Sequence, residues 1–346
     1  MSNKSIRYCI WNNKGGVGKT FLTYCLSIEY SLRHPHKRVV VIDMCPQANV
    51  SEMLLGGNGI GEERLASCCD NGKTIANYIK SRYDRSRFGK LGDEVNYFIK
   101  INEHNKNMPE NMYLLPGDVN LDVCSTIINY MASAPEKMAW TKSHHLLHDL
   151  VETFENSCNA EFVFFIDSNP SFANYTQLGM ITANRLIIPC TADSASIRGI
   201  GNVLRLIHGI KTGKNQFSDD DIFNTFNTKI SEAGIDPPKI HLFVLNKART
   251  IDKTASIAYK SHVNEIEVVT KNFLQNYPDS FTDVEDQQRV FEIKDCNTLS
   301  PVLSFTGLPP SVLQHGRYAV YDQKTQVNQS QITPFLANLK AIVEKL

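Results

Sequence analysis

The stretch Trp11-Asn-Asn-Lys-Gly-Gly-Val-Gly-Lys-Thr-Phe21 decides the fold of this chain. It follows an apolar, β-prone run that begins at Ile6, and it precedes a helical pattern that extends from Thr20 to Leu32. A strand, a glycine-rich turn and a helix in this order form a phosphate-binding loop, because glycines let backbone N–H groups converge on phosphate oxygens. In such a loop Lys19 reaches the β- and γ-phosphates, and the Thr20 hydroxyl ligates Mg²⁺. The stretch therefore predicts a nucleotide site.

A second lysine lies inside this loop. The segment Lys14-Gly-Gly-Val-Gly-Lys19-Thr20 resembles the deviant Walker A motif of the ParA/MinD group of P-loop ATPases, although the strict motif has glycine where this chain has Asn13. In that family the early lysine reaches across a nucleotide-sandwich dimer to the partner's phosphates. The resemblance implies ATP and Mg²⁺ as cofactors, a homodimer in the ATP state, and catalytic roles for both lysines. The predicted nucleotide contacts in the loop are Asn13, Lys14, Gly15, Gly16, Val17, Gly18, Lys19, Thr20 and Phe21.

The next strand pattern ends in a carboxylate. Arg38 to Asp43 is a continuous apolar run, which suits a parallel sheet that is covered on both faces. The segment from Asp43 to Asn49 resembles the family's Asp-x-Asp-Pro-Gln-x-Asn motif, in which the first aspartate lies near the metal and the second activates water. Cys45 occupies the second position. A neutral thiol is a poor base. Two nearby lysines favour a thiolate, but a thiolate is a soft, larger base with poorer hydrogen-bond geometry toward water, so we expect weak hydrolysis. Compensation by other groups is the alternative.

A second apolar strand, Glu161 to Asp167, has the Walker B pattern, in which the aspartate holds a Mg²⁺ water. The predicted metal site is therefore Thr20, Asp43 and Asp167, partly through water. By resemblance, Asn246 contacts the adenine at the end of another strand, although it can also simply end that strand. The loop-like segment from Ser300 to Pro310, with Pro309, is expected to close over the base.

These patterns predict an α/β fold, with a doubly wound, mainly parallel sheet flanked by helices. We expect one ParA-like ATPase domain over residues 1–346, with a helical and loop elaboration at about 57–112. An apolar stripe predicts a C-terminal helix at about 334–346, which should pack against the core because it lacks the cationic face of membrane-surface helices.

The charge composition limits which binding partners the sequence predicts. The 36 basic and 36 acidic residues cancel, so no global field favours nucleic acid or a membrane. A local cluster can bind DNA non-specifically or form a solvated helix face; it consists of Lys80, Arg82, Arg85, Arg87 and Lys90. The nine dispersed cysteines, the early first strand and the lack of a long apolar run predict a soluble, cytoplasmic protein.

Three histidines, His144, His145 and His148, include a pair at i and i+4, a spacing that can place two metal ligands on one helix face. No third ligand is evident in the sequence. We therefore expect a surface or partly packed group rather than a metal site.

The resemblance implies an ATPase that positions or partitions a cargo, either DNA or a protein complex, with a partner protein that stimulates hydrolysis. Two other functions stay open. With Cys45 in place of aspartate, the chain can be an ATP-dependent scaffold or switch that scarcely hydrolyses ATP and regulates an effector. A small-molecule kinase or a cobyrinate-type synthetase would need a substrate pocket that the sequence does not reveal.

Overall fold

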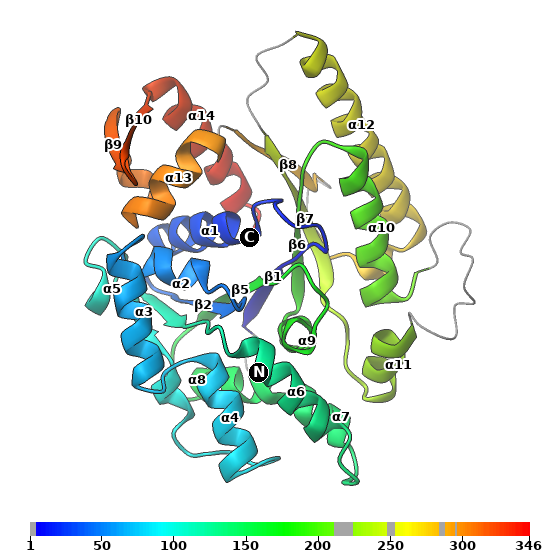
Figure 1. The fold of residues 1–346 in the computed structure, drawn as a ribbon. Helices are drawn as coiled ribbons and strands as arrows, with labels where there is room; N and C mark the ends of the chain where they lie inside the picture. Colours follow the sequence, from blue (N-terminus) through cyan, green and yellow to red (C-terminus); the bar gives the residue numbers. More distant parts are fainter. Residues whose placement is uncertain (1–4, 211–223, 248–252, 284–287, 295) are drawn as a thin grey trace.

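An eight-stranded sheet lies at the centre of the protein (Figure 1), in the strand order β3-β4-β2-β5-β1-β6-β7-β8. The computed structural model describes residues 5–210, 224–247, 253–283, 288–294 and 296–346. All neighbouring strands in this sheet are parallel except β3, which runs antiparallel to β4. The strands are β1 (Ile6–Ile10), β2 (Arg38–Met44), β3 (Ile99–Lys100), β4 (Met112–Leu115), β5 (Phe162–Ser168), β6 (Arg185–Cys190), β7 (Lys239–Lys247) and β8 (Val290–Lys294).

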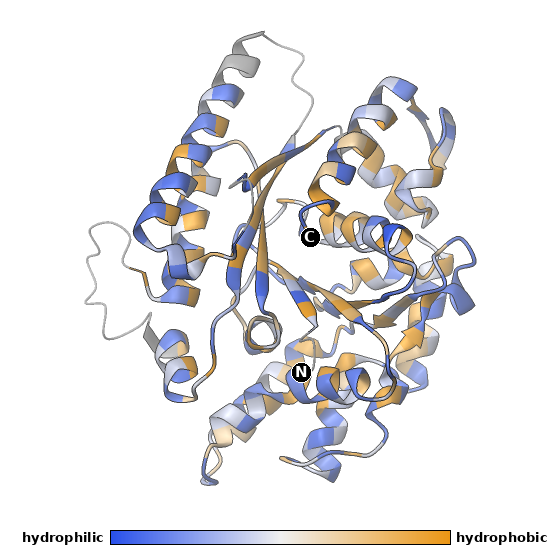
Figure 2. Cartoon of the chain, turned by 180° about the vertical axis from the view of Figure 1, so that it is seen from behind, coloured by the Kyte–Doolittle hydropathy of each residue, from blue (hydrophilic) through white to orange (hydrophobic). Residues whose placement is uncertain are grey.

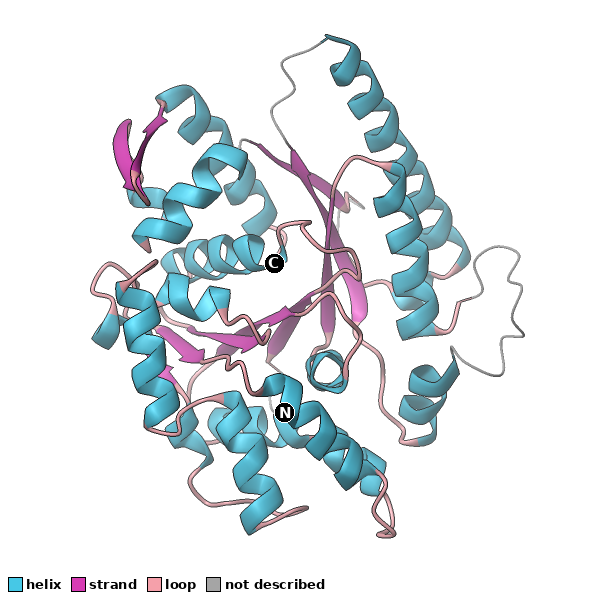
Figure 3. Cartoon of the chain, in the orientation of Figure 1, coloured by secondary structure: helices cyan, strands magenta, loops and turns pink. Residues whose placement is uncertain are grey.

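Helices cover both faces of this sheet (Figure 3), and each face has its own apolar core. One face is covered by α1 (Lys19–Arg33), α2 (Asn49–Leu54), α3 (Ile60–Asp70), α5 (Ile101–His104), α13 (Cys296–Thr306) and α14 (Gln329–Val343). The other is covered by α4 (Ile75–Arg85), α6 (Leu121–Ala132), α7 (Ala139–His144), α8 (Leu146–Glu155), α9 (Asn174–Thr182), α10 (Ser194–His208), α11 (Asn224–Glu232) and α12 (Lys253–Asn276).

The central strands are apolar along most of their length (Figure 2), because side chains on both faces of the sheet are buried. Every residue of β5 is buried, for example. The prediction of a doubly wound, mainly parallel sheet flanked by helices is confirmed.

The prediction of a loop at residues 300–310 is wrong over its first half, where α13 extends to Thr306. Proline disfavours a helix interior, and Pro301 lies inside this one. Leu299, Val302 and Leu303 are nevertheless fully buried in the apolar core on this face, and this burial outweighs the hydrogen bond that the proline cannot make.

The C-terminal helix α14 begins before Pro334, at a capping box formed by Asn328 and Gln331. It packs on α1, where the rings of Phe21 and Phe335 lie 6.0 Å apart, so its apolar stripe faces the core. Among the described residues, no helix is both long and apolar enough to cross a bilayer.

Phe335→Ala tests this packing. Phe335 is fully buried, so its truncation leaves a cavity and should lower the free energy of unfolding by about 3–5 kcal/mol. Urea denaturation followed by circular dichroism measures the change. The control Thr333→Ala, at an exposed position of the same helix, should change stability by less than about 0.5 kcal/mol. Equal effects of the two substitutions would contradict the docking of α14.

Candidate nucleotide site

The loop between β1 and α1 is shaped by the Asn12 side chain. Its Nδ2 donates to the Pro189 carbonyl at 2.8 Å, and its Oδ1 accepts from the Lys14 N–H at 3.0 Å. Inside the loop, the Lys19 ammonium donates to the carbonyls of Asn12 and Lys14 at 3.1 and 3.0 Å. Lys19 is buried, so the loop carries a fixed positive charge among its backbone groups. This arrangement is suited to a phosphate.

The glycine at position 18 is required by both conformation and space. Gly18 has a φ of 84°, in the left-handed region, and a Cβ there would clash with the Asn246 amide. Asn246, predicted to contact adenine, therefore lies directly beside the loop. The structure brings these two segments together although they are far apart in the sequence.

Asp167 and Asp43 occupy paired positions at the carboxyl ends of β5 and β2, and both are fully buried. Asp167 accepts hydrogen bonds from the hydroxyls of Thr20, at 2.8 Å, and Thr23, at 3.2 Å. Burial and the neighbouring Asp43 raise the pKa of Asp167, while Thr20 and Lys19 lower it. A buried carboxylate and a hydroxyl are oxygen ligands of the kind that Mg²⁺ prefers, so Thr20 and Asp167 fit the predicted metal.

Asp43 was predicted to lie at the metal, and in this structure its carboxylate binds the segment that follows β2. One of its oxygens accepts the Cys45 N–H at 3.1 Å, and the other accepts the Ser51 N–H at 3.1 Å and the Ser51 hydroxyl at 2.7 Å. Both oxygens are thus engaged in ordering the segment that follows β2. Burial raises the pKa of Asp43 in spite of these hydrogen bonds.

The thiol of Cys45 lies between polar neighbours. Its sulfur accepts a hydrogen bond from Asn169 Nδ2 at 3.6 Å. Burial, together with Asp43 and Asp167, raises the pKa of Cys45 to about 11. The prediction of a thiolate beside two lysines is therefore wrong, because burial and the two neighbouring carboxylates favour the neutral thiol. At neutral pH this side chain is a protonated thiol.

Lys14 is held at the edge of the site by its own chain. Its ammonium donates to Thr191 Oγ1 at 2.7 Å and forms an ion pair with Asp193 at 2.5 Å. Asp193 also caps α10 by accepting the Ser196 N–H at 2.8 Å. Burial raises the pKa of Asp193, but hydrogen bonds from Lys14 and Thr191 outweigh burial and hold that pKa well below its usual range.

The other residues that were predicted to contact the nucleotide differ in their exposure to solvent and in what they pack against. Val17 is buried, Gly15 and Gly16 are exposed, and Asn13 is intermediate. The Phe21 ring packs on α14 instead of facing the site. Pro309 precedes η3 (Pro310–Val312), and the adjacent Leu308 carbonyl accepts from the Tyr24 hydroxyl at 2.8 Å, so this segment docks on the body of α1.

The site contains residues that the sequence analysis did not assign to it. They are Asn12, Ser51, Asn169, Thr191 and Asp193. Ser51 lies in α2, but the other four residues follow the ends of β1, β5 and β6 within three residues. Because the carboxyl ends of parallel strands share one edge, the position of these four relative to the strands was the available signal.

Most residues of the predicted DNA-binding cluster contact other side chains of the protein, and one of them is buried. Arg82 is buried and donates to Asp149, so it does not belong to a DNA-facing surface. Lys80 pairs with Asp84, and Arg85 pairs with Asp93 at 2.9 Å. The guanidinium of Arg87 lies over the Tyr83 ring, 5.1 Å from its centroid. Non-specific DNA binding stays a prediction that rests on the four cations other than Arg82.

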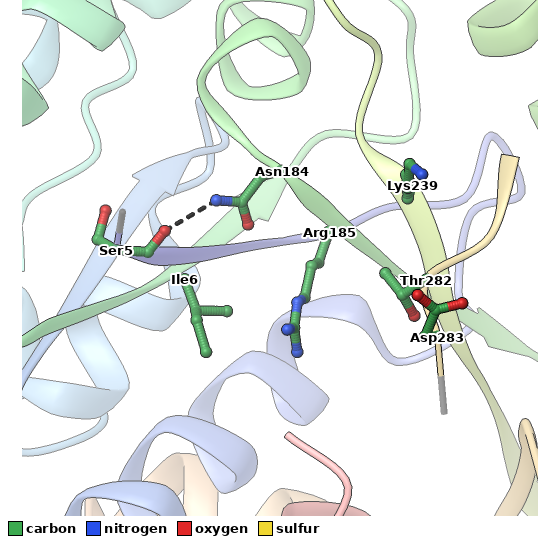
Figure 4. Close-up of a pocket in the computed structure, with 7 residues that line it drawn as sticks. All are labelled: Ser5, Ile6, Asn184, Arg185, Lys239, Thr282 and Asp283. Carbon is green, nitrogen blue, oxygen red and sulfur yellow. Dashed lines mark hydrogen bonds between the residues drawn. The ribbon is translucent and has the colours of Figure 1, made fainter. Parts of the chain in front are cut away.

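A separate pocket of about 330 Å³ lies at the opposite edge of the sheet (Figure 4). Its lining includes Ile6, Arg185 and Lys239, which lie at the amino ends of β1, β6 and β7. It is therefore unrelated to the phosphate-binding loop.

Comparison with known proteins places these features in a family. Residues 5–218 match the family model described as an AAA domain. An uncharacterized protein of Methanocaldococcus jannaschii is 26% identical over 208 residues, which span 58% of this chain and 65% of that protein, just under two thirds of its length.

Two solved structures share the fold over nearly all of both chains. Apo McdA from Cyanothece has a TM-score of 0.58 and 15% identity, and the match covers 98% of this chain and 99% of McdA. A putative plasmid partition protein from Borrelia burgdorferi B31, bound to AMPPNP, has a TM-score of 0.52 and 15% identity, with coverage of 99% and 100%.

The buried carboxylates predict a pH dependence of stability. The pKa of Asp167 is raised from 3.8 to about 7, so its contribution is fully present below about pH 4 and is lost as the pH rises through 7. Burial lowers the pKa values of His144, His208 and His241 to about 4, and these groups make stability rise with pH, so the contribution of Asp167 is measured as a difference between two proteins. Without nucleotide or divalent cation, the free energy of unfolding of wild type minus that of Asp167→Asn should fall by at least about 1 kcal/mol between pH 5 and pH 8. Asp84→Asn, on the exposed surface of α4, should keep the slope of wild type. An unchanged slope in Asp167→Asn would contradict the assignment.

Proposed function

Because this chain belongs to the AAA-domain family of P-loop ATPases, we propose that it is a ParA-like switch that binds ATP and Mg²⁺, dimerises, and positions or partitions a cargo. One observation carries the proposal: the loop holds two lysines in different environments. Lys19 lies inside the loop among backbone carbonyls, and Lys14 lies at its edge on Asp193. A single nucleotide needs only the first of these cations for its β- and γ-phosphates.

The nucleotide is bound by the loop's N–H groups and Lys19, and Thr20 and Asp167 hold the Mg²⁺. The ion supplies charge neutralisation for the phosphates. Support comes from the residues themselves, since Thr20 and Asp167 are already 2.8 Å apart and Lys19 is already inside the loop. The AMPPNP bound to the partition protein of the same fold agrees with this choice of ligand.

Lys14 supplies the connection between subunits. The Lys14 and Asp193 side chains are 28% and 43% exposed, so their ion pair is weak and readily exchanged for another anion. Asp193 keeps hydrogen bonds from Thr191 and the Ser196 N–H after Lys14 leaves. The phosphates of a second subunit are a more highly charged partner for this ammonium, which favours a dimer when ATP is bound.

Hydrolysis is slow in this proposal, because the position next to the attacking water carries a neutral thiol. With a pKa of about 11, Cys45 is protonated at neutral pH, and its neighbour Asn169 is a neutral amide. Neither group accepts a proton from water at this pH. A partner protein that contributes a base would then time the release of the cargo, whether that cargo is DNA or a protein complex.

A second candidate follows from the same observation. If no partner supplies the base, the ATP-bound dimer is long-lived and acts as a scaffold or switch that regulates an effector. Rapid turnover by the protein alone, in the experiment on Cys45 below, would exclude this second candidate.

Substitutions of the two lysines should separate binding from dimerisation. Lys14→Ala should bind ATP with Mg²⁺ as wild type does but stay monomeric, whereas Lys19→Ala should lose both properties. Asp193→Asn removes the competing charge and should lower the ATP concentration needed for half-dimerisation several-fold. Light scattering at increasing ATP measures all three. Dimerisation of Lys14→Ala at wild-type ATP concentrations would show that this lysine does not bridge subunits.

Substitution of Cys45 tests the chemistry. Cys45→Asp restores a carboxylate and should raise the rate of phosphate release by at least about ten-fold, since general-base help is typically worth about 10²- to 10⁴-fold. Cys45→Ala removes the thiol without adding a base and should match wild type. Rapid turnover by wild type alone, unchanged in Cys45→Ala, would mean that another group already acts as the base and would exclude the scaffold.

A further inference from the structure

The three histidines near residue 145 are divided by the junction between α7 and α8. His144 is buried at the end of α7, where its ring stacks on Trp140 with centroids 4.3 Å apart. Its Nδ1 lies 3.0 Å from the Trp140 carbonyl. His144 thus belongs to the packing of α7, and the i, i+4 pair noted in the sequence does not converge.

A different set of side chains comes together at the start of α8. His145, His148 and Asp149 each offer a ligand atom, and these atoms all lie within 4.8 Å of one another. The cause is helical spacing, because positions i, i+3 and i+4 share one face. Asp149 is thus a candidate third ligand that was not evident in the sequence.

Two observations favour the binding of a cation by these three side chains. His145 Nε2 is buried and has no hydrogen-bond partner among the described residues, which is costly for a polar atom. Asp149 Oδ2 accepts a hydrogen bond from Arg82 at 3.1 Å, which orients the carboxylate and leaves Oδ1 for a ligand. Outer hydrogen bonds of this kind commonly position metal ligands.

Access and charge also suit a small cation. The side chains of His148 and Asp149 are 28% and 32% exposed, so an ion can enter from solvent. Of the two guanidinium groups nearby, Arg7 is offset by Glu155 at 2.6 Å, and Arg82 shares Asp149 with the site. Glu152, 3.9 Å from His148 Nε2, adds a further negative charge.

We propose that His145, His148 and Asp149 bind one divalent transition-metal ion of the zinc class. Two imidazoles and one carboxylate are the ligands that Zn²⁺ prefers, whereas Mg²⁺ and Ca²⁺ favour oxygen alone. Zinc bonds of about 2.0–2.2 Å require ligand atoms roughly 3.4 Å apart, so small side-chain rotations close the group around the ion. The site ties α8 to α4 through Asp149 and Arg82, and it is independent of the nucleotide.

The test is calorimetric titration of Zn²⁺ into the full-length, chelator-treated protein without a histidine tag. Wild type should bind one equivalent that His145→Ala and His148→Ala each weaken by at least about ten-fold. His262→Ala is the matched control, because His262 has a glutamate one turn away, Glu265 at 3.5 Å, but belongs to no such group of three among the residues that the structure describes. It should leave the affinity unchanged.

Cobalt provides a second readout that does not depend on the stability of the variants. Wild type loaded with Co²⁺ should show ligand-field bands without a thiolate charge-transfer band, because no cysteine belongs to the group. A strong thiolate band would place the metal on cysteines, and equal zinc affinity in wild type and His148→Ala would show that His148 is not a ligand. Either result would overturn the proposal. Failure of wild type to bind zinc would overturn it as well.

Discussion

The site depends on one constraint, the pairing of β1 with β5 on one side and β6 on the other. Ile10 lies opposite Asp167 in one register and opposite Ile187 in the other, and the Trp11 N–H extends the second ladder by donating to the Ile187 carbonyl at 3.1 Å. Since these strands are parallel, their carboxyl ends meet at one edge, where the loop after β1 begins. The loop therefore faces Asp167 on one side and the Thr191–Asp193 segment on the other.

This placement gives the two lysines different freedom. Lys19 is buried and bound to two loop carbonyls, so its charge is fixed where phosphate binds. Lys14 lies in a half-exposed ion pair, and such pairs contribute only about 0–1 kcal/mol. A weak contact that keeps the ammonium in place, yet releases it to a stronger anion, suits a switch better than a buried pair would. In the mechanism we propose, Cys45 complements this property, because a protonated thiol would prolong the ATP-bound state in which Lys14 has left Asp193.

Much of the fold followed from the sequence, because the strand patterns before Trp11, at Asp43 and at Asp167 are short, apolar and end in functional residues. The phosphate-binding loop was predictable for the same reason. Contacts between distant segments were not: Lys14 meets Asp193, and Gly18 meets Asn246, only once the strand order is known. Local signals also misled where burial prevailed, as at Pro301 in α13 and at the Cys45 thiol, whose pKa is raised by burial and by two neighbouring carboxylates. Asp149 was overlooked because it lies inside α8, where no strand end marks it as a site residue.

The most direct test of the switch is a crystal structure of the protein with AMPPNP and Mg²⁺. We expect a two-fold dimer in which Lys14 has left Asp193 and contacts the phosphates bound by the partner subunit, while Lys19 contacts those of its own subunit. Thr20 and Asp167 should lie at the Mg²⁺. A nucleotide-bound structure in which Lys14 keeps its 2.5 Å ion pair with Asp193, with no second copy over the nucleotide, would contradict this mechanism.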